Sequence, residues 1–442
     1  MNRSVNNTLL KIKFNKNNIF FFIGLYSYSI LLIFFHIDFL SLSSLVFVAL
    51  ITFYFSKKYK SLAIVLYVAL AFRFITIFLG NYLIILPDSW GDATEFERKA
   101  WEWSQNGFFE VFNEYPSERK SFHISWILAF FYSLTDRSVI MGQSINLIFG
   151  MGSLLLGSRL ANLIWNEKVS IKVGWIIALY PTLILYSCLI LRESFIWFFL
   201  LVALYGISSS VKYGGFKSFS LIFIGFFGAS FFHGGMLIGA LVFLIIYMNI
   251  YFFKSMKKIR YYKINKKNFF LLIIFGILIF IFLTNIDKMP KLAALKNFLD
   301  YEQVLVEISN RNIGNANFPE WTVPNNLFEL IYKTPIRLIY FMFSPFPWDV
   351  SKSSHLIGML DGLFHLILLI LLIKNFRFIM SENNLKFIFL ILVTYLIVYG
   401  VATGNFGTGI RHRTKFIIVL ILLVAPWLPN FVFNKKKRKT IK

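Results

Sequence analysis

The stretch "NFGTGIRHRTKF", residues 405–416, combines residue types that can bind phosphate. It places Arg411, His412 and Arg413 just before the last strongly apolar run. Arginine holds phosphate oxygens through a planar fork of N–H donors, and the first turn of a helix offers free N–H groups to an anion. We interpret the stretch as a phosphate site, against the alternative of a cationic anchor among lipid headgroups. In an extended stretch Arg411 and Arg413 share one face, whereas in a helix they lie about 200° apart and only one of them reaches the pocket.

Carboxylates stand near other apolar runs. Asp88 and Asp92 flank Ser-Trp-Gly after one run, and Glu193 follows Arg192 between two others. A carboxylate can accept a hydroxyl proton or support positive charge that develops at a sugar carbon. The alternative for Arg192 and Glu193 is a charged turn at the headgroups, and Asp92 is also a plausible helix N-cap. His233, before two glycines, is a further candidate, although a turn histidine is more often structural.

The composition indicates what must hold these side chains. The chain has 442 residues, of which 57% are hydrophobic and 15% charged, which is typical of a polytopic membrane protein. The net charge of +24 comes from Lys and Arg grouped in short stretches between apolar segments, the pattern of the positive-inside bias rather than of nucleic-acid binding. Cys188 is the only cysteine, so an intramolecular disulfide is excluded.

Apolar runs of about 20 residues predict membrane-spanning helices. We predict an all-α membrane domain over 1–442 with about twelve spans, a retained first helix, and both ends of the chain inside. This orientation puts most basic clusters inside. The predicted spans are 19–36, 39–56, 61–86, 138–164, 173–191, 195–210, 217–232, 235–253, 268–285, 355–373, 386–404 and 414–432.

Two long connections then lie outside, at 87–137 and 286–354. In the first, an amphipathic helix near 93–106 is expected to lie flat on the membrane with its acids in solvent, followed by a juxtamembrane or re-entrant helix at 122–134. The second ends in an aromatic, amphipathic stretch that carries Arg337, which we expect either to line a lipid-chain site or to seat the loop on the membrane.

These stretches together resemble a known class. The acidic outer loop and the proline-broken span with its terminal acid are similar to the GT-C membrane glycosyltransferases. The "P-x(5)-S-x(3)-L-R-E-S" stretch at 181–194, "H-G-G-M" at 233–236 and "G-T-x-I-R-H-R" at 407–413 further resemble bacterial O-antigen and capsule repeat-unit polymerases. The resemblance implies a GT-C-like fold in the bacterial cytoplasmic membrane and a polyprenyl (pyro)phosphate-linked sugar donor. A chain-length regulator and a flippase are implied as possible partners.

Site roles follow from the resemblance. It implies catalytic roles for Asp92 and Glu193, with Asp88 beside them. The expected binding residues are Arg192, His233, Arg337, Arg411, His412 and Arg413. No metal ligand is assigned, although a divalent metal stays open. Two alternatives also stay open: a transferase that adds a single sugar to a lipid, glycan or protein, and a flippase or transporter of lipid-linked oligosaccharides, which would favour matched halves and a midplane site.

Overall fold

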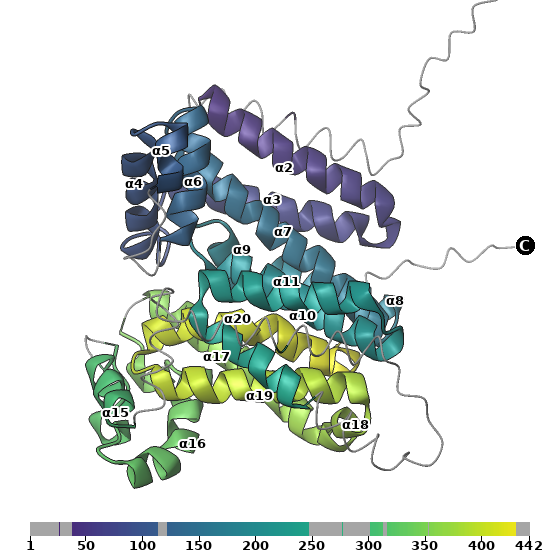
Figure 1. The fold of residues 1–442 in the computed structure, drawn as a ribbon, viewed down its shortest axis with the longest axis vertical. Helices are drawn as coiled ribbons and strands as arrows, with labels where there is room; N and C mark the ends of the chain where they lie inside the picture. The colour runs from purple at the N-terminus through teal and green to yellow at the C-terminus, as the bar shows by residue number, and fades with distance from the viewer. Residues whose placement is uncertain are drawn as a thin grey trace, which may run out of the picture.

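The protein is an α-helical bundle in which long apolar helices run side by side (Figure 1). The computed structural model describes residues 38–113, 122–246, 301–312, 316–351 and 353–429, together with the single residues 26 and 276. The sequence prediction of an all-α membrane protein is confirmed at this level. The N-terminal half contributes α2 (Phe39–Lys58), α3 (Ala63–Tyr82), α4 (Asp92–Ser104), α5 (Phe108–Asn113), α6 (His123–Leu134), α7 (Val139–Ile164), α8 (Glu167–Leu179), α9 (Pro181–Ser187), α10 (Glu193–Lys212) and α11 (Phe216–Phe232).

The C-terminal half packs against α10 and ends in the central helix of the bundle. It contains α15 (Tyr301–Asn310), α16 (Leu327–Phe343), α17 (Ser353–Lys374), α18 (Phe376–Ser381), α19 (Asn383–Ala402) and α20 (Phe406–Val424). Every residue from 413 to 424 is buried, because α20 contacts α7, α8, α10, α16, α17 and α19. Charged side chains on α20 therefore face protein rather than lipid.

Six described helices are long and apolar enough to cross a membrane, and the bent pair α8–α9 would make a seventh. The count of twelve is not established. The predicted spans 19–36 and 268–285, apart from residues 26 and 276, lie outside the described residues, as does the end of 235–253. Apolar α11 is only 17 residues long. The predicted last span, 414–432, begins earlier, at Phe406, and is not among the six because three cations lie in its first half.

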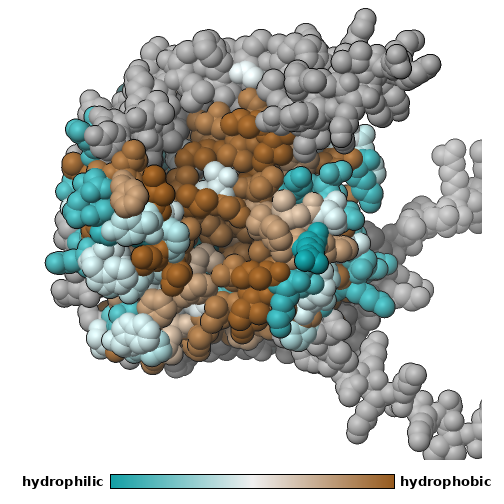
Figure 2. Space-filling view, turned by 90° about the horizontal axis from the view of Figure 1, so that it is seen from below, coloured by the Kyte–Doolittle hydropathy of each residue, from teal (hydrophilic) through white to brown (hydrophobic). Residues whose placement is uncertain are grey.

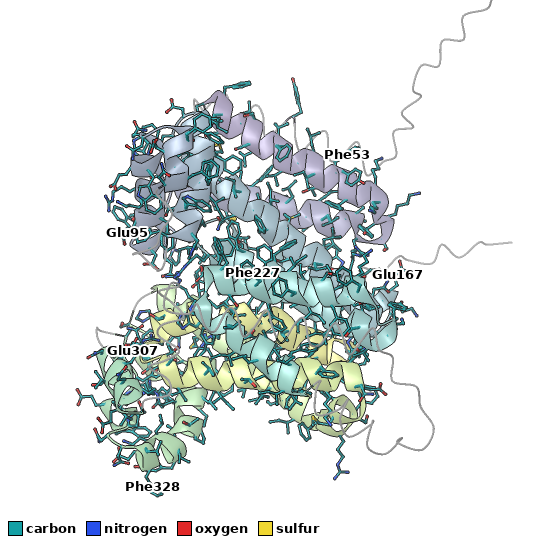
Figure 3. The ribbon with its side chains drawn as sticks, viewed as in Figure 1. Phe53, Glu95, Glu167, Phe227, Glu307 and Phe328 are labelled. Carbon is teal, nitrogen blue, oxygen red and sulfur yellow. The ribbon has the colours of Figure 1, made fainter. Side chains whose placement is uncertain are left out.

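The described parts of the two predicted outer connections lie at the same end of the bundle. The group α4–α6 and the pair α15–α16 flank this end in Figure 1, and α18 and the start of α8 lie at the other. Figure 3 shows Glu95 and Glu307 at the first end and Glu167 at the opposite one. In Figure 2 a hydrophobic band separates hydrophilic surfaces at the two ends, as expected for helices that cross a bilayer.

A buried arginine stabilises the break at Pro181. Helices α8 and α9 meet at an angle of 65°, which leaves backbone carbonyls without helical partners. Arg73 of α3 donates to the carbonyl oxygens of Ala178 (3.3 Å) and Ile177 (3.4 Å) and to Ser187 Oγ (2.9 Å). Arg73, whose partner the sequence does not reveal, thus fixes the bent segment that leads to Arg192 and Glu193.

Helix α4 packs on α6 instead of lying flat on a membrane surface, so that expectation is wrong. Phe96 and Trp103 contact the ring of Phe122 with centroid distances of 5.5 and 6.3 Å. Glu97, expected in solvent, is only 6% exposed. Its carboxylate accepts from Arg137 Nη2 (2.7 Å) and from the Tyr132 hydroxyl (3.0 Å). Burial and this carboxylate raise the pKa of Tyr132, so its hydroxyl remains a donor.

We expect Glu97→Gln to lower the stability of the protein by roughly 1–3 kcal/mol, because the change leaves Arg137 without its charged partner. The measurement is the melting temperature of purified protein in detergent. Glu102→Gln is the matched control, since Glu102 pairs with Arg98 and Lys99 at the surface and such pairs contribute little. Equal melting temperatures for both variants would show that the Glu97 pair does not stabilise the fold.

Candidate functional site

A cationic side chain of α20 joins two acids that are far apart in the sequence. Arg411 Nη1 donates to Asp92 Oδ2 at 2.8 Å, and Arg411 Nη2 lies 3.2 Å from Glu193 Oε1. The Glu193 side chain is 2% exposed and the Asp92 side chain 47% exposed. The sequence therefore anticipated three residues that the fold brings into direct contact. We call Asp92, Arg192, Glu193, Arg411 and Lys415 the charged centre.

Local backbone structure presents the two acids. Asp92 is the first residue of α4, while Gly91, with φ of +72°, is the N-cap; the prediction of Asp92 as N-cap is wrong by one residue. Residues 188–192 interrupt the helix between α9 and α10. Asn146 Nδ2 donates to the carbonyl oxygens of Leu189 and Leu191 at 2.6 and 2.5 Å. This interruption lets α10 begin at Glu193 beside α20.

Two further cations lie beside the acids. The Arg192 guanidinium stacks over the Phe96 ring at 5.4 Å, and its Nε and Nη1 atoms are buried without a hydrogen-bond partner among the described residues. Lys415, one turn after Arg411, is 2% exposed with Nζ 5.1 Å from the centroid of the Tyr399 ring. Burial lowers the pKa of Arg192, because the protein interior disfavours its positive charge. An anion bound next to Arg192 would stabilise that charge.

Unpaired buried polar atoms point to the same conclusion. Oε2 of Glu193, like the two nitrogens of Arg192, has no hydrogen-bond partner within the described ranges. Buried polar groups in proteins are normally paired, and exceptions gather at sites that bind or react. These atoms of Arg192 and Glu193 could therefore bond to a polar ligand.

Histidines surround the centre on the side of α19. His233 Nδ1 lies 2.8 Å from the Tyr399 hydroxyl, and His412 Nδ1 lies 3.2 Å from Thr403 Oγ1. The two imidazole rings are 5.8 Å apart. His233 and His412 were both predicted from the sequence, and the structure places them next to each other at this site.

Asp88 belongs to the edge of the site. Its Oδ2 accepts from the Tyr186 hydroxyl at 2.7 Å, and its backbone has a φ of 58°. A positive φ is uncommon for a residue other than glycine. Asp88 thus ties the loop before α4 to α9, and the structure shows no direct contact with Arg411.

The other two predicted arginines lie in separate networks. Arg413 Nε donates to Asp361 Oδ2 at 2.6 Å, and its other nitrogens donate to backbone carbonyls that include that of Gly358. Arg337 donates to the carbonyl oxygens of Thr403 (2.6 Å), Val401 and Thr322. Both guanidinium groups are buried and hydrogen-bonded to protein, so neither joins the charged centre.

The helix N-terminus expected to hold phosphate is already capped. The side chain of Asn405 accepts from the N–H groups of Gly407 (2.8 Å) and Thr408 (3.3 Å). These backbone N–H groups at the start of α20 are therefore not free to bind an anion. The cationic side chains of the charged centre are the better candidates.

Lys415 belongs to the cationic stretch but was not among the predicted site residues, and Tyr399 and Tyr186 were not predicted either. Lys415 had a usable signal, because its position four residues after Arg411 places both on one helix face. The tyrosines lie in apolar runs that give no sign of which face turns inward. No cluster of three His, Cys, Asp or Glu side chains suited to a metal ion occurs in the described part of the chain.

The fold and the site define the chain as an α-helical membrane-spanning protein with a charged centre near one end of its bundle. No protein-family model, curated protein or solved structure matches the chain.

Proposed function

We propose that the chain is a membrane glycosyltransferase that uses a sugar donor linked to polyprenyl phosphate or pyrophosphate. The observation that carries the proposal is the contact of Arg411 with both Asp92 and Glu193, beside the unpaired guanidinium nitrogens of Arg192. A reaction of this kind needs a carboxylate near the acceptor hydroxyl and cations near the leaving phosphate.

An apolar groove beside the centre supports a lipid-linked donor. The groove has a volume of about 820 Å³ and lies between α2, α6, α7, α10 and α11. Phe195, two residues after Glu193, lines it, as does Phe232, which precedes His233. Phe227, labelled in Figure 3, also lines it. A ligand with an anionic head and a long apolar tail would satisfy both the centre and the groove.

In the proposed step, the oxygen of an acceptor hydroxyl forms a bond to the anomeric carbon of the donor. The bond between that carbon and the phosphate oxygen breaks, and its electron pair leaves with the polyprenyl (pyro)phosphate. Asp92 accepts the hydroxyl proton because its carboxylate is the more accessible of the two. Arg192 and Lys415 stabilise the leaving phosphate, and Glu193 positions Arg411.

Within this class we propose a repeat-unit polymerase of the bacterial cytoplasmic membrane. A gene-deletion strain, complemented with the wild-type gene or with Asp92→Asn, tests this. We expect the deletion to leave single repeat units, the wild-type gene to restore the polysaccharide ladder on a gel, and Asp92→Asn to fail although the protein accumulates.

Other outcomes would reject the polymerase. A full ladder that lacks one sugar would indicate the single-sugar transferase. Lipid-linked units inaccessible to periodate added outside the membrane would indicate the transporter. An unchanged ladder with an unchanged sugar composition would overturn the proposal altogether.

A further inference from the structure

A second cleft, more polar than the apolar groove, lies at the first turn of α4. It has a volume of about 530 Å³ and is lined by the end of α3, by α4, by the start of α7 and by Leu189 and Ile190. This volume is within the usual range of small-molecule sites. Ala93, next to Asp92, and Ile190, close to Glu193, both line the cleft. The cleft therefore adjoins the charged centre.

The side chains in the cleft suit a ligand rich in hydroxyl groups. Trp90, which is 69% exposed, offers an aromatic face at the rim. Gln143 is only 6% exposed, and its Oε1 accepts from Asn81 Nδ2 at 2.7 Å. The amide nitrogen of Gln143 and the carboxylate of Glu95 bond to no described residue. These groups can donate to and accept from sugar hydroxyls.

The charges of the cleft argue against a phosphate ligand. Arg137 and Arg98, its two cations, are already paired with Glu97 and Glu102. The free charge is the carboxylate of Glu95, which repels anions. A neutral sugar is thus favoured here, and the phosphate belongs on the side of Arg192.

Helix α7 separates this cleft from the apolar groove. Gln143 lines the cleft, while Met141 and Ser144 line the groove. Ile190 lines the cleft and Phe195 lines the groove, and both lie within three residues of Glu193 in the sequence. An acceptor in the cleft and a lipid-linked donor in the groove would meet at Asp92.

From this arrangement we infer that the cleft between α3, α4 and α7 binds the glycan of the acceptor, with Trp90 stacking on a sugar ring and Gln143 and Glu95 bonding its hydroxyls. That the bound glycan is the acceptor of a transfer reaction rests on the proposed function. The glycan site itself requires only the geometry of the cleft.

The test measures binding without catalysis. Oligosaccharide released by mild acid from the lipid-linked units of the deletion strain is titrated into full-length protein in nanodiscs by calorimetry. We expect Trp90→Leu and Glu95→Gln, both at exposed positions, each to raise Kd about tenfold or more. Trp321→Leu and Glu102→Gln are the matched controls and should bind as wild type does. Glu193→Gln should also bind normally while transfer is lost.

Each outcome decides between the inference and the proposed function. Unchanged Kd in Trp90→Leu and Glu95→Gln, or no binding by the wild type, would overturn the inference even where transfer is observed. Weakened glycan binding in these variants, without any transfer by the wild type, would keep the inference and overturn the function.

Discussion

Asp92→Asn and Glu193→Gln are each expected to lower the rate of glycan transfer by roughly 10²–10⁴-fold, the usual cost of removing a positioned acid or base. Asparagine at 92 cannot accept the hydroxyl proton. Glutamine at 193 can still accept a hydrogen bond from Arg411 but no longer offsets its charge. The assay is incorporation of labelled repeat units into polymer by purified protein in nanodiscs.

Both substitutions keep side-chain size, so we expect both proteins to accumulate in the membrane. Asp88→Asn provides a graded comparison, because Asp88 contacts Tyr186 and not Arg411; it should retain more activity than either variant. Near-normal transfer by Asp92→Asn and Glu193→Gln would rule out the chemistry proposed for the centre.

Arg411→Lys and Arg413→Lys should fail in different ways. Lysine keeps the charge of Arg411 but cannot bridge Asp92 and Glu193 with two separate nitrogens, so transfer should fall by roughly 10²–10³-fold. Arg413 has hydrogen bonds to Asp361 and to three backbone carbonyls. Its replacement should lower stability, by about 1.5–3 kcal/mol for the lost charged hydrogen bond alone.

Melting temperature and specific activity, measured on the same preparations, separate the two effects. Arg411→Lys should melt near the wild-type temperature and be inactive, whereas Arg413→Lys should melt earlier and retain activity per folded molecule. Full activity and stability in both variants would contradict the roles assigned to Arg411 and Arg413.

The sequence predicts the apolar helices well, because a run of about 20 apolar residues has few alternatives to a span. It also predicted that Arg411 and Arg413 have different roles if the stretch is helical, because helix periodicity places them on different faces. The structure agrees: Arg411 faces Asp92 and Glu193, and Arg413 faces Asp361.

The sequence does not show which helices contact one another. Arg337 and Glu97 appeared to be a site cation and a solvated acid, yet tertiary packing buries both among partners distant in the chain. Lys415 was not among the predicted site residues for the same reason. Intramembrane charges indicate an interior surface, but long-range packing decides whether that surface is structural or reactive.

The contact of Arg411 with Asp92 and Glu193 joins side chains that are 319 and 218 positions apart. During synthesis both acids leave the ribosome long before the arginine does. A nascent chain therefore carries two carboxylates without their shared counterion until α20 inserts. The charged centre is thus completed only when α20 packs against α10, after the other helices that contribute to it have been synthesised.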